Sequence, residues 1–410
     1  GKRHDLQESC ERTSVSGRTM RAAALLVIAV IAQCARALRL VRAPRMCEPA
    51  ARPAASVFSR RNVLSGAAIA ATGTAGLIAL KPTTPVFVPA AGSMSERTVV
   101  ITGANTGLGF ESARRLAAAS ARVVVTARTE EKARSAVSRL REELGESGAS
   151  AGLVPLALDL ADLRSVAAFP AALQNALGSD VAVDVLLNNA GVMAIPARRE
   201  TADGFERQLG INHIGHFALV SALLPLLKRA QDGFRVINVS SDAHRLASRE
   251  ALSAAIDNSL DPPEYSPWGN YALSKAANVL FTKELQRRMD EAGVRGSAVS
   301  LHPGVVNTDL GRFLLADSAL GGVDAVVAGT PMKELYAATD PKAKALAEAV
   351  LGTFMLPTDR GANTQVSLAH DHLVGSMPWK DHSMHHPLTS MAPFWYFVVN
   401  EDLVGGSRRC

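Results

Sequence analysis

The sequence predicts an α/β fold in which a parallel sheet is covered by helices on both faces. Six short segments rich in Val, Ile and Leu alternate with longer stretches of Ala, Leu and Arg that have helical spacing. Strands that are apolar along their whole length are typical of parallel sheets buried on both sides. With 48% apolar and 20% charged residues the chain can bury a sizeable core, which excludes a disordered or fibrous protein. The expected strands span residues 98–102, 122–127, 153–157, 183–187, 235–239 and 297–301.

The first strand leads into a glycine-rich turn. Residues 102–109 read TGANTGLG, and a helical pattern follows through residue 119. Between a strand and a helix N-terminus, such a turn lets the backbone approach a pyrophosphate and points free N–H groups at it. The same glycines would also suit a tight turn for steric reasons alone. The residues expected to bind a dinucleotide here are Gly103, Asn105, Thr106, Gly107, Leu108 and Gly109.

The end of the second strand bears on which dinucleotide is bound. A carboxylate at this place would bind the ribose 2′-hydroxyl, whereas a basic residue accommodates a 2′-phosphate. Residues 126–128 read TAR, which offers no carboxylate and one guanidinium, a good partner for phosphate. Arg128 therefore favours NADP(H) as the cofactor. The alternative is a solvated arginine at a strand end.

Four further motifs follow in sequence order, three at strand ends and one at the start of a helix. They are Asp159-Leu160, the NNAG of residues 188–191, Ser240-Ser241, and the pair Tyr271 and Lys275. Residues four apart share a helix face, so an ammonium is expected beside a phenol. That charge would lower the pKa of the Tyr271 phenol, which suits a general acid or base at a carbonyl or alcohol oxygen. An ordinary surface pair without a role is the alternative.

In this order the motifs resemble those of the short-chain dehydrogenase/reductase family, over roughly residues 96–375. The resemblance implies a doubly wound Rossmann fold and a catalytic set of Asn212, Ser241, Tyr271 and Lys275. Within that set Ser241 is preferred to Ser240, and Asn212 supports a water-linked proton relay to the lysine. Further cofactor contacts implied by the resemblance are Asp159, Leu160, Asn189, Ala190, Gly191, Tyr271, Lys275, Pro303, Gly304, Val306 and Thr308.

Two expectations concern residues around this set. The 29 residues between Ser241 and Tyr271 exceed the family's usual spacer, so the excess must loop out if the two side chains are to meet. His213 and His216 flank Asn212 and are interpreted as packing residues.

A narrower resemblance rests on residues 203–217, 274–281 and 300–308. They are similar to the retinol-dehydrogenase-like branch, which includes chloroplast-envelope members and adjoins the light-dependent protochlorophyllide reductases. The branch implies a lipophilic carbonyl or alcohol as substrate. Protochlorophyllide reductases rely on an active-site cysteine, and residues 48–409 contain none, so a pigment reductase is the lesser alternative. The same lack of cysteines excludes a disulfide framework in this region.

Residues 1–93 are interpreted as a targeting extension, and residues 94–410 as one dehydrogenase domain. Of the 44 basic and 38 acidic residues, 13 and 4 lie in the extension, which leaves 31 and 34, so no nucleic-acid partner is expected for the body. Three signal-like segments follow one another in this extension. They are a short apolar run after Met20, an acid-poor segment at 37–58, and the twin arginines Arg60 and Arg61 before the apolar run 65–80. This series predicts an algal plastid address at the thylakoid, on the stromal face or in the lumen. The run 65–80 is either cleaved or kept as an anchor.

The remaining features are an insertion and the C-terminal tail. Residues 309–356 are expected to form a lid inserted near the substrate. Five histidines crowd residues 370–386 without a recognised ligand pattern, so no metal is expected. The aromatic residues of 393–399 fit a core segment, or contact with an envelope or thylakoid membrane, or a partner.

Two functions from different classes are consistent with these patterns. The first is an oxidoreductase that transfers a hydride between NADP(H) and a lipophilic carbonyl or alcohol carbon. The second is a non-catalytic Rossmann scaffold or nucleotide sensor in a photosynthetic membrane complex. The complete Asn-Ser-Tyr-Lys set favours the enzyme, whereas the aromatic tail and the insertion favour a partner, either a second copy of the chain or a complex.

Overall fold

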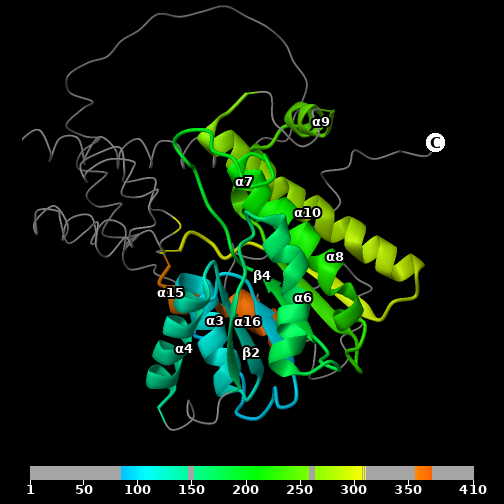
Figure 1. The fold of residues 1–410 in the computed structure, drawn as a ribbon. Helices are drawn as coiled ribbons and strands as arrows, with labels where there is room; N and C mark the ends of the chain where they lie inside the picture. The colour runs from blue at the N-terminus through cyan, green and yellow to red at the C-terminus, as the bar shows by residue number, and fades with distance from the viewer. Residues whose placement is uncertain are drawn as a thin grey trace, which may run out of the picture. The chain divides into compact units, whose positions relative to one another are not determined.

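The computed structural model describes residues 85–145, 152–257, 264–306, 308, 310 and 356–371, and every structural statement concerns these residues (Figure 1). Its centre is one six-stranded sheet with the order β3-β2-β1-β4-β5-β6, in which all neighbouring strands are parallel. The strands are β1 (Thr98–Ile101), β2 (Arg122–Ala127), β3 (Leu153–Ala157), β4 (Val185–Asn188), β5 (Phe234–Val239) and β6 (Gly296–Leu301). This arrangement confirms the doubly wound Rossmann fold.

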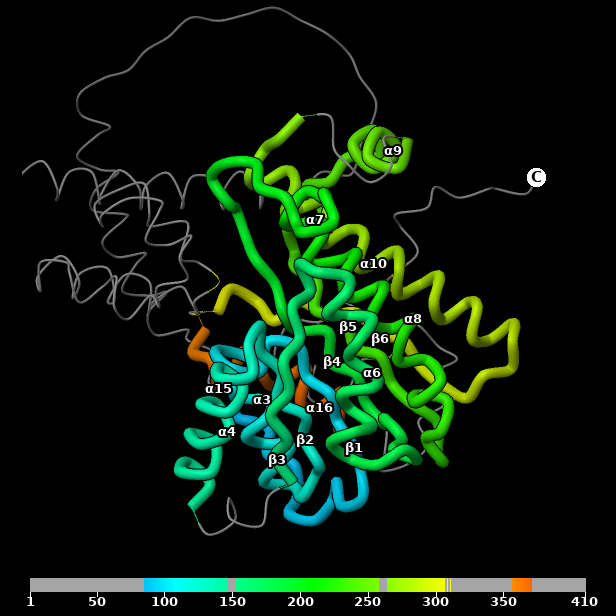
Figure 2. Tube along the Cα trace, viewed as in Figure 1, coloured from blue at the N-terminus to red at the C-terminus, as the bar shows by residue number. Residues whose placement is uncertain are grey.

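Helices cover both faces of the sheet (Figures 1 and 2). Side chains alternate along each strand, so Val99 and Ile101 face one layer while Val100 faces the other. The first layer holds α3 (Gly107–Ala118), α4 (Glu130–Leu144), α15 (Thr358–Gly361) and α16 (Asn363–Asp371). The second holds α6 (Leu163–Leu177), α8 (Gly215–Leu227) and the long α10 (Pro267–Glu291). Each layer buries its own apolar cluster against the sheet.

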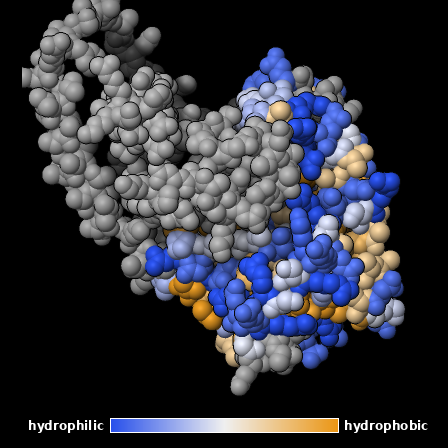
Figure 3. Space-filling model, turned by 60° about the vertical axis from the view of Figure 1, so that its left-hand side comes forward, coloured by the Kyte–Doolittle hydropathy of each residue, from blue (hydrophilic) through white to orange (hydrophobic). Residues whose placement is uncertain are grey.

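The helices are amphipathic where they meet water. Helix α4 buries Ala133, Ala136, Val137 and Leu140 and turns its charged residues outward. Figure 3 shows one face of the molecule, on which hydrophilic residues cover most of the described surface and apolar residues form smaller patches. The run Arg207–Leu227 is long and apolar enough to cross a membrane by composition, but 61% of its most apolar stretch is buried within the protein. It serves here as a core helix.

Short elements lie between the main ones at the carboxyl edge of the sheet. A one-turn helix α7 (Arg207–Leu209) and a π-helical turn (Gly210–Ile214) lead into α8. A 3-10 helix (Asp242–Leu246) follows β5, and α9 (Arg249–Asp257) comes before α10. Neighbouring strands β1 and β4 send their chains to opposite faces of the sheet, which opens a crevice at this edge.

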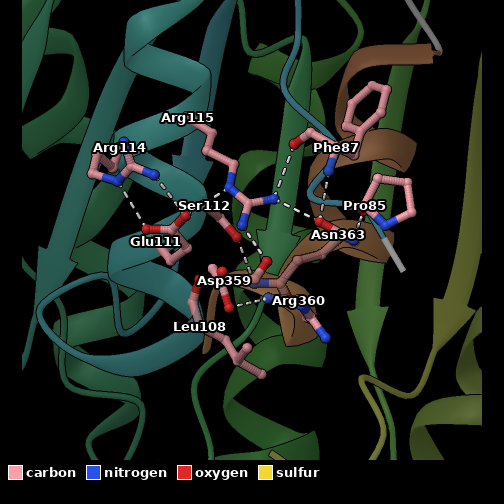
Figure 4. A network of polar contacts seen from close by, with 11 residues as sticks. Pro85, Phe87, Leu108, Glu111, Ser112, Arg114, Arg115, Asp359, Arg360 and Asn363 are labelled. Carbon is pink, nitrogen blue, oxygen red and sulfur yellow. Dashed lines mark hydrogen bonds and ion pairs between the residues drawn. The ribbon is translucent and has the colours of Figure 1, made fainter. Parts of the chain in front are cut away.

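A buried arginine ties the first described residues to the body (Figure 4). Arg115 on α3 is 1% exposed, and its Nε donates to Glu111 Oε1 at 2.6 Å. Its Nη1 donates to the Phe87 carbonyl at 2.9 Å and to Asn363 Oδ1 at 2.7 Å, and its Nη2 donates to the Asp359 carbonyl. One guanidinium thus holds three segments that are distant in the sequence.

Asn363 completes this network from the other side. Its Oδ1 accepts the Phe87 N–H at 2.9 Å, and its Nδ2 donates to the Pro85 carbonyl at 2.9 Å. The Phe87 ring meets His370 edge-on at 5.7 Å, and His370 Nε2 lies 3.1 Å from Ser93 Oγ. The structure therefore places residues 85–93 in the folded body, ahead of the boundary expected at residue 93.

The expected insertion is framed by two paired residues. Val306 and Leu356 form a parallel bridge, and Leu356 N donates to the Val305 carbonyl at 2.8 Å. Most of residues 309–356 lie outside the described residues, as do the targeting signals, four of the five clustered histidines and the aromatic tail. Those expectations stay predictions.

Candidate active site and cofactor cavity

A cavity of about 550 Å³ lies at the crevice where β1 and β4 end. Backbone and side chains from the turns after β1, β2, β3 and β4 form its walls. Twelve of the residues expected to bind a dinucleotide line it: Gly103, Asn105, Thr106, Gly107, Leu108, Arg128, Asp159, Leu160, Asn189, Ala190, Gly191 and Thr308. The position and lining suit an extended dinucleotide.

The glycine-rich turn has the backbone conformation that its sequence predicts. Gly103 and Gly107 adopt φ angles of +62° and +57°, a region that residues with a side chain rarely occupy. A Cβ at Gly109 would lie 2.5 Å from Asn189 Nδ2 and from the Gly103 carbonyl. Gly109 therefore supports the turn from behind and does not line the cavity.

Five other residues expected to contact the cofactor also lie outside the cavity lining: Tyr271, Lys275, Pro303, Gly304 and Val306. Val306 packs instead on Gly361, where a Cβ would lie 2.6 Å from the valine Cγ2. Thr308, also expected to contact the cofactor, stands over the glycine-rich turn, with its Cγ2 3.4 Å from a Cβ placed at Gly107. Lys275 Nζ is 3.6 Å from a Cβ placed at Gly191, so it borders the cavity.

Tyr271 and Ser241 meet at the carboxyl edge of the sheet. Tyr271, on the first turns of α10, is 3% exposed, and the Ser241 side chain lies close enough to influence its pKa. Burial raises the pKa of Tyr271 to about 12, and the Ser241 hydrogen bond offsets only part of this shift. The expected lowering of the Tyr271 pKa by Lys275 was wrong: desolvation of the phenolate raises this pKa, and Lys275 is not among the groups that lower it.

Lys275 lies under the tyrosine. It is 3% exposed, its Nζ donates to the Val239 carbonyl at 2.9 Å, and the same atom is 5.7 Å from the centre of the Tyr271 ring. Burial lowers the pKa of Lys275 to about 8. The Lys275 amine and the Tyr271 phenol thus share one buried site, and burial favours the neutral form of each group.

The two adjacent serines have different surroundings. Ser240 is buried, and its Oγ donates to the Lys275 carbonyl at 2.8 Å. Ser241 caps the 3-10 helix, where its Oγ accepts the Ala243 N–H at 3.2 Å, and its hydroxyl reaches Tyr271. The geometry therefore agrees with the preference for Ser241 that the resemblance implies.

Asn212 stands on the π-helical turn and is fully buried. Its Oδ1 accepts the Val192 N–H at 2.8 Å, while its Nδ2 donates to the Val192 carbonyl and to Ser274 Oγ, both at 2.9 Å. A Cβ at Gly191 would lie 3.3 Å from Asn212 Oδ1. Asn212 and Lys275 therefore approach the same glycine. The role of Asn212 in a proton relay stays a prediction.

Several cavity residues were not anticipated from the sequence. Lys132, Ser135 and Arg139 line the cavity from one face of α4, together with Glu131. Arg139 is held with its guanidinium carbon 4.3 Å from the centre of the Phe110 ring. The i, i+3, i+7 spacing of the first three residues was the available signal. Two more cationic residues, Arg199 and Arg207, line the cavity as well.

Metal ligation has no support in this part of the chain. Among the residues that the structure describes, no group of three or more His, Cys, Asp and Glu side chains could hold a metal ion.

Comparisons with known proteins place these features in a family. Residues 97–254 match the family model described as short chain dehydrogenase. Retinol dehydrogenase 14 of Mus musculus is 42% identical to this chain, over 54% of this chain and 65% of the relative. Retinol dehydrogenase 12 of Homo sapiens is 43% identical to this chain, over 53% of this chain and 63% of the relative. The chain thus spans just under two thirds of the length of these curated relatives.

A solved structure was also found. An uncharacterised protein from Mycobacterium paratuberculosis is 33% identical, with 71% of this chain and 80% of that chain covered and a TM-score of 0.47.

Proposed function

The chain belongs to the retinol dehydrogenase-like branch of the short-chain dehydrogenase family, and on that premise we propose that it transfers a hydride between NADP(H) and the carbonyl or alcohol carbon of a lipophilic substrate. Members of this family are oxidoreductases that bind a nicotinamide cofactor. The lipophilic substrate is proposed because the curated relatives are retinol dehydrogenases. The preference for NADP(H) is proposed from Arg128.

The observation that carries the proposal is the buried contact between Ser241 and Tyr271 with Lys275 beneath it. A phenol with a pKa of about 12 is protonated at neutral pH, so Tyr271 can donate a proton to a substrate carbonyl oxygen. The Ser241 hydroxyl can donate a hydrogen bond to the same oxygen as negative charge develops on it. The Lys275 ammonium would stabilise the phenolate that remains. A bound nicotinamide supplies the hydride.

The cavity residues have the complementary task of holding the cofactor. The glycine-rich turn presents backbone N–H groups at the start of α3, which suits the pyrophosphate. Arg128, Lys132 and Arg139 bring three cationic side chains to the wall formed by β2 and α4. This cationic wall is where we propose that the 2′-phosphate of NADP(H) binds.

The direct test is NADPH oxidation against a panel of aldehydes, ketones and pigments. The protein should keep residues 85–93, because Arg115 and Asn363 bind them. We expect turnover of apolar carbonyl compounds. NADPH binding without turnover of any member of the panel would favour the scaffold or nucleotide sensor, and turnover of pigments alone would favour the pigment reductase.

Replacing Arg128 by Ala should weaken NADPH far more than NADH, because only NADPH carries the phosphate. A charge-assisted hydrogen bond of about 1.5–3 kcal/mol corresponds to a tenfold to hundredfold loss in NADPH affinity. Titration of both cofactors checks this. Arg134→Ala is the matched control, since Arg134 lies nearby on α4, pairs with Glu130 and does not line the cavity. Equal losses for the two cofactors would contradict the assignment.

The pH dependence of carbonyl reduction should follow Lys275. Its pKa of about 8 means that the ammonium is charged below that pH and neutral above it. Tyr271 stays protonated throughout this range. We therefore expect kcat to be constant below about pH 7.5 and to fall about tenfold per pH unit above about pH 8. In Lys275→Arg any residual activity should lack this fall. A kcat that still rises at pH 9 would show that ionisation of the phenol controls the rate instead.

We also propose the plastid address of the chain, with the body on the NADPH-rich stromal side of a thylakoid membrane. The support is the series of targeting signals in residues 20–80, which lie outside the described residues. Import of a tagged full-length chain into isolated plastids, followed by protease treatment of the thylakoids, tests this. Resistance of the body to protease would place it in the lumen.

A further inference from the structure

His216 has a more specific position than a packing role requires. It lies on the first turn of α8, directly after the π-helical turn, and is 1% exposed. Both ring nitrogens have partners: Nδ1 is 3.0 Å from the Asn212 carbonyl oxygen, and Nε2 is 2.9 Å from Thr102 Oγ1. One imidazole thus bridges the π-helical turn and the end of β1.

The partners of His216 assign its protonation. Burial lowers the pKa of His216 to about 3, so the ring is neutral and carries one N–H. The Asn212 carbonyl can only accept, so the proton lies on Nδ1 and donates to it. Nε2 is then an acceptor for the Thr102 hydroxyl proton. The bridge is therefore directional, from Thr102 through the ring to Asn212.

Thr102 connects this bridge to the cofactor cavity. Its Oγ1 accepts the N–H groups of Asn189 and Ala190, both at 2.9 Å, and those two residues line the cavity. The hydroxyl proton has two acceptors within reach, His216 Nε2 at 2.9 Å and the Leu187 carbonyl at 3.4 Å, and the shorter contact is the one to His216. The threonine thus fixes the turn after β4 against the glycine-rich turn after β1.

At its other end, His216 contacts the backbone carbonyl of Asn212 and so completes the hydrogen bonds of that residue. The Asn212 side chain is occupied by Val192 and Ser274. The carbonyl is held by His216 at i, i+4, across a turn whose π-helical geometry breaks the ordinary helix ladder. Without the imidazole, this turn would lose a contact that fixes its orientation toward Lys275.

We propose that His216 is a positioning residue that couples the cofactor-binding turns, through Thr102, to Asn212 in the proton relay. The proposal rests on the proposed function, because it assumes a dinucleotide in the cavity and a relay through Asn212. It assigns each ring nitrogen a separate task. Nε2 supports the turns that hold the cofactor, and Nδ1 supports the turn that carries the relay residue.

Two variants of the full chain separate these tasks. His216→Asn keeps a donor at the δ position for the Asn212 carbonyl but does not reach Thr102. His216→Gln places an amide at the ε position for Thr102 but leaves the Asn212 carbonyl unpaired. We expect His216→Asn to weaken NADPH binding about tenfold with kcat within about threefold of wild type, and His216→Gln to show the reverse pattern.

Matched controls keep a general loss of stability apart from these effects. His216→Leu should lower both NADPH affinity and kcat. His213→Leu should change neither by more than about threefold, since His213 contacts Asn278 and Phe281 on the outer side of the turn. Melting temperatures are measured for all four variants. If Asn and Gln at position 216 have the same effect on NADPH affinity and kcat, the division of tasks is wrong.

An independent measurement needs neither activity nor a variant that folds. In the wild-type chain labelled with 15N-histidine, NMR should show His216 as the neutral Nδ1–H tautomer from about pH 5 to 8, and NADPH should shift its Nε2 resonance. An Nε2–H tautomer, or no response to bound NADPH, would overturn the proposal. Failure of the proposed function looks different: these signals would be as expected while no carbonyl compound is reduced.

Discussion

Replacing Tyr271 by Phe is expected to lower kcat for carbonyl reduction by about 10²–10⁴-fold, the range typical of a lost general acid. This change removes only the Tyr271 hydroxyl, and with it the interaction with Ser241. The ring keeps its packing and its edge-on contact with Trp268 at 6.1 Å. NADPH affinity and melting temperature should therefore stay close to wild type. Steady-state kinetics with saturating NADPH measure the effect.

A second tyrosine offers the matched control for this experiment. Tyr265 lies six residues before Tyr271, and its hydroxyl donates to the Ile195 carbonyl, with Gln208 as a further neighbour. Tyr265→Phe removes a hydroxyl from the same neighbourhood without touching Ser241. We expect its kcat to stay within a few-fold of wild type. If Tyr271→Phe also retained activity within a few-fold, Tyr271 would not be the proton donor.

Removing residues 1–90 is expected to destabilise the protein by roughly 3 kcal/mol or more. The deletion leaves the Asn363 amide without the Pro85 carbonyl and takes the Phe87 carbonyl from the buried Arg115. An unsatisfied buried group costs about 1–3 kcal/mol, and the lost burial of the Phe87 ring adds to this. A protein starting at residue 84 keeps all these contacts and is the control. Urea unfolding of both proteins checks the difference in the free energy of unfolding.

The Arg115 network also bears on where the N-terminal extension can be cleaved. A start near Ala91 would follow the small residues at the end of the twin-arginine-like signal, but it would remove Pro85 and Phe87 from the network in Figure 4. We therefore expect the native N-terminus to lie at or before Pro85. N-terminal sequencing of the native protein decides this. A native start at Ala91, combined with stability equal to the longer protein, would show that the Arg115 network contributes little.

The strands could be predicted closely because their signal is local. The expected β2 and β3 agree with the structure at both ends, whereas β4 begins at Val185 rather than at residue 183. The cause is tertiary: Val183 N donates to the Leu226 carbonyl on α8 instead of to a strand. At its other end β4 extends to Asn188, whose Nδ2 donates to Asn238 Oδ1 at 2.8 Å on β5. Neither contact could be read from the sequence of β4 alone.

The candidate site also contains residues that could be predicted from the sequence and residues that could not. Residues next to a strand end, such as Gly103 and Asn189, could be placed because the chain itself brings them to the carboxyl edge. Arg139 and His216 could not, because their roles depend on which helix face turns inward. The pKa of Tyr271 was predicted in the wrong direction for a related reason. Sequence spacing shows that Lys275 is a neighbour but not how deeply Tyr271 is buried, and it is burial that raises the pKa of the phenol.

The bridge between Val306 and Leu356 holds the two ends of the segment between them side by side. A segment whose two ends are clamped side by side can change in length at small expense, since doubling a flexible loop adds only about 0.6 kcal/mol of closure entropy. Insertions or deletions between residues 311 and 355 would leave the sheet, the glycine-rich turn and the cavity residues Thr308 and Leu310 where they are. Related chains can therefore differ in the length of this segment while the sheet and the glycine-rich turn stay unchanged.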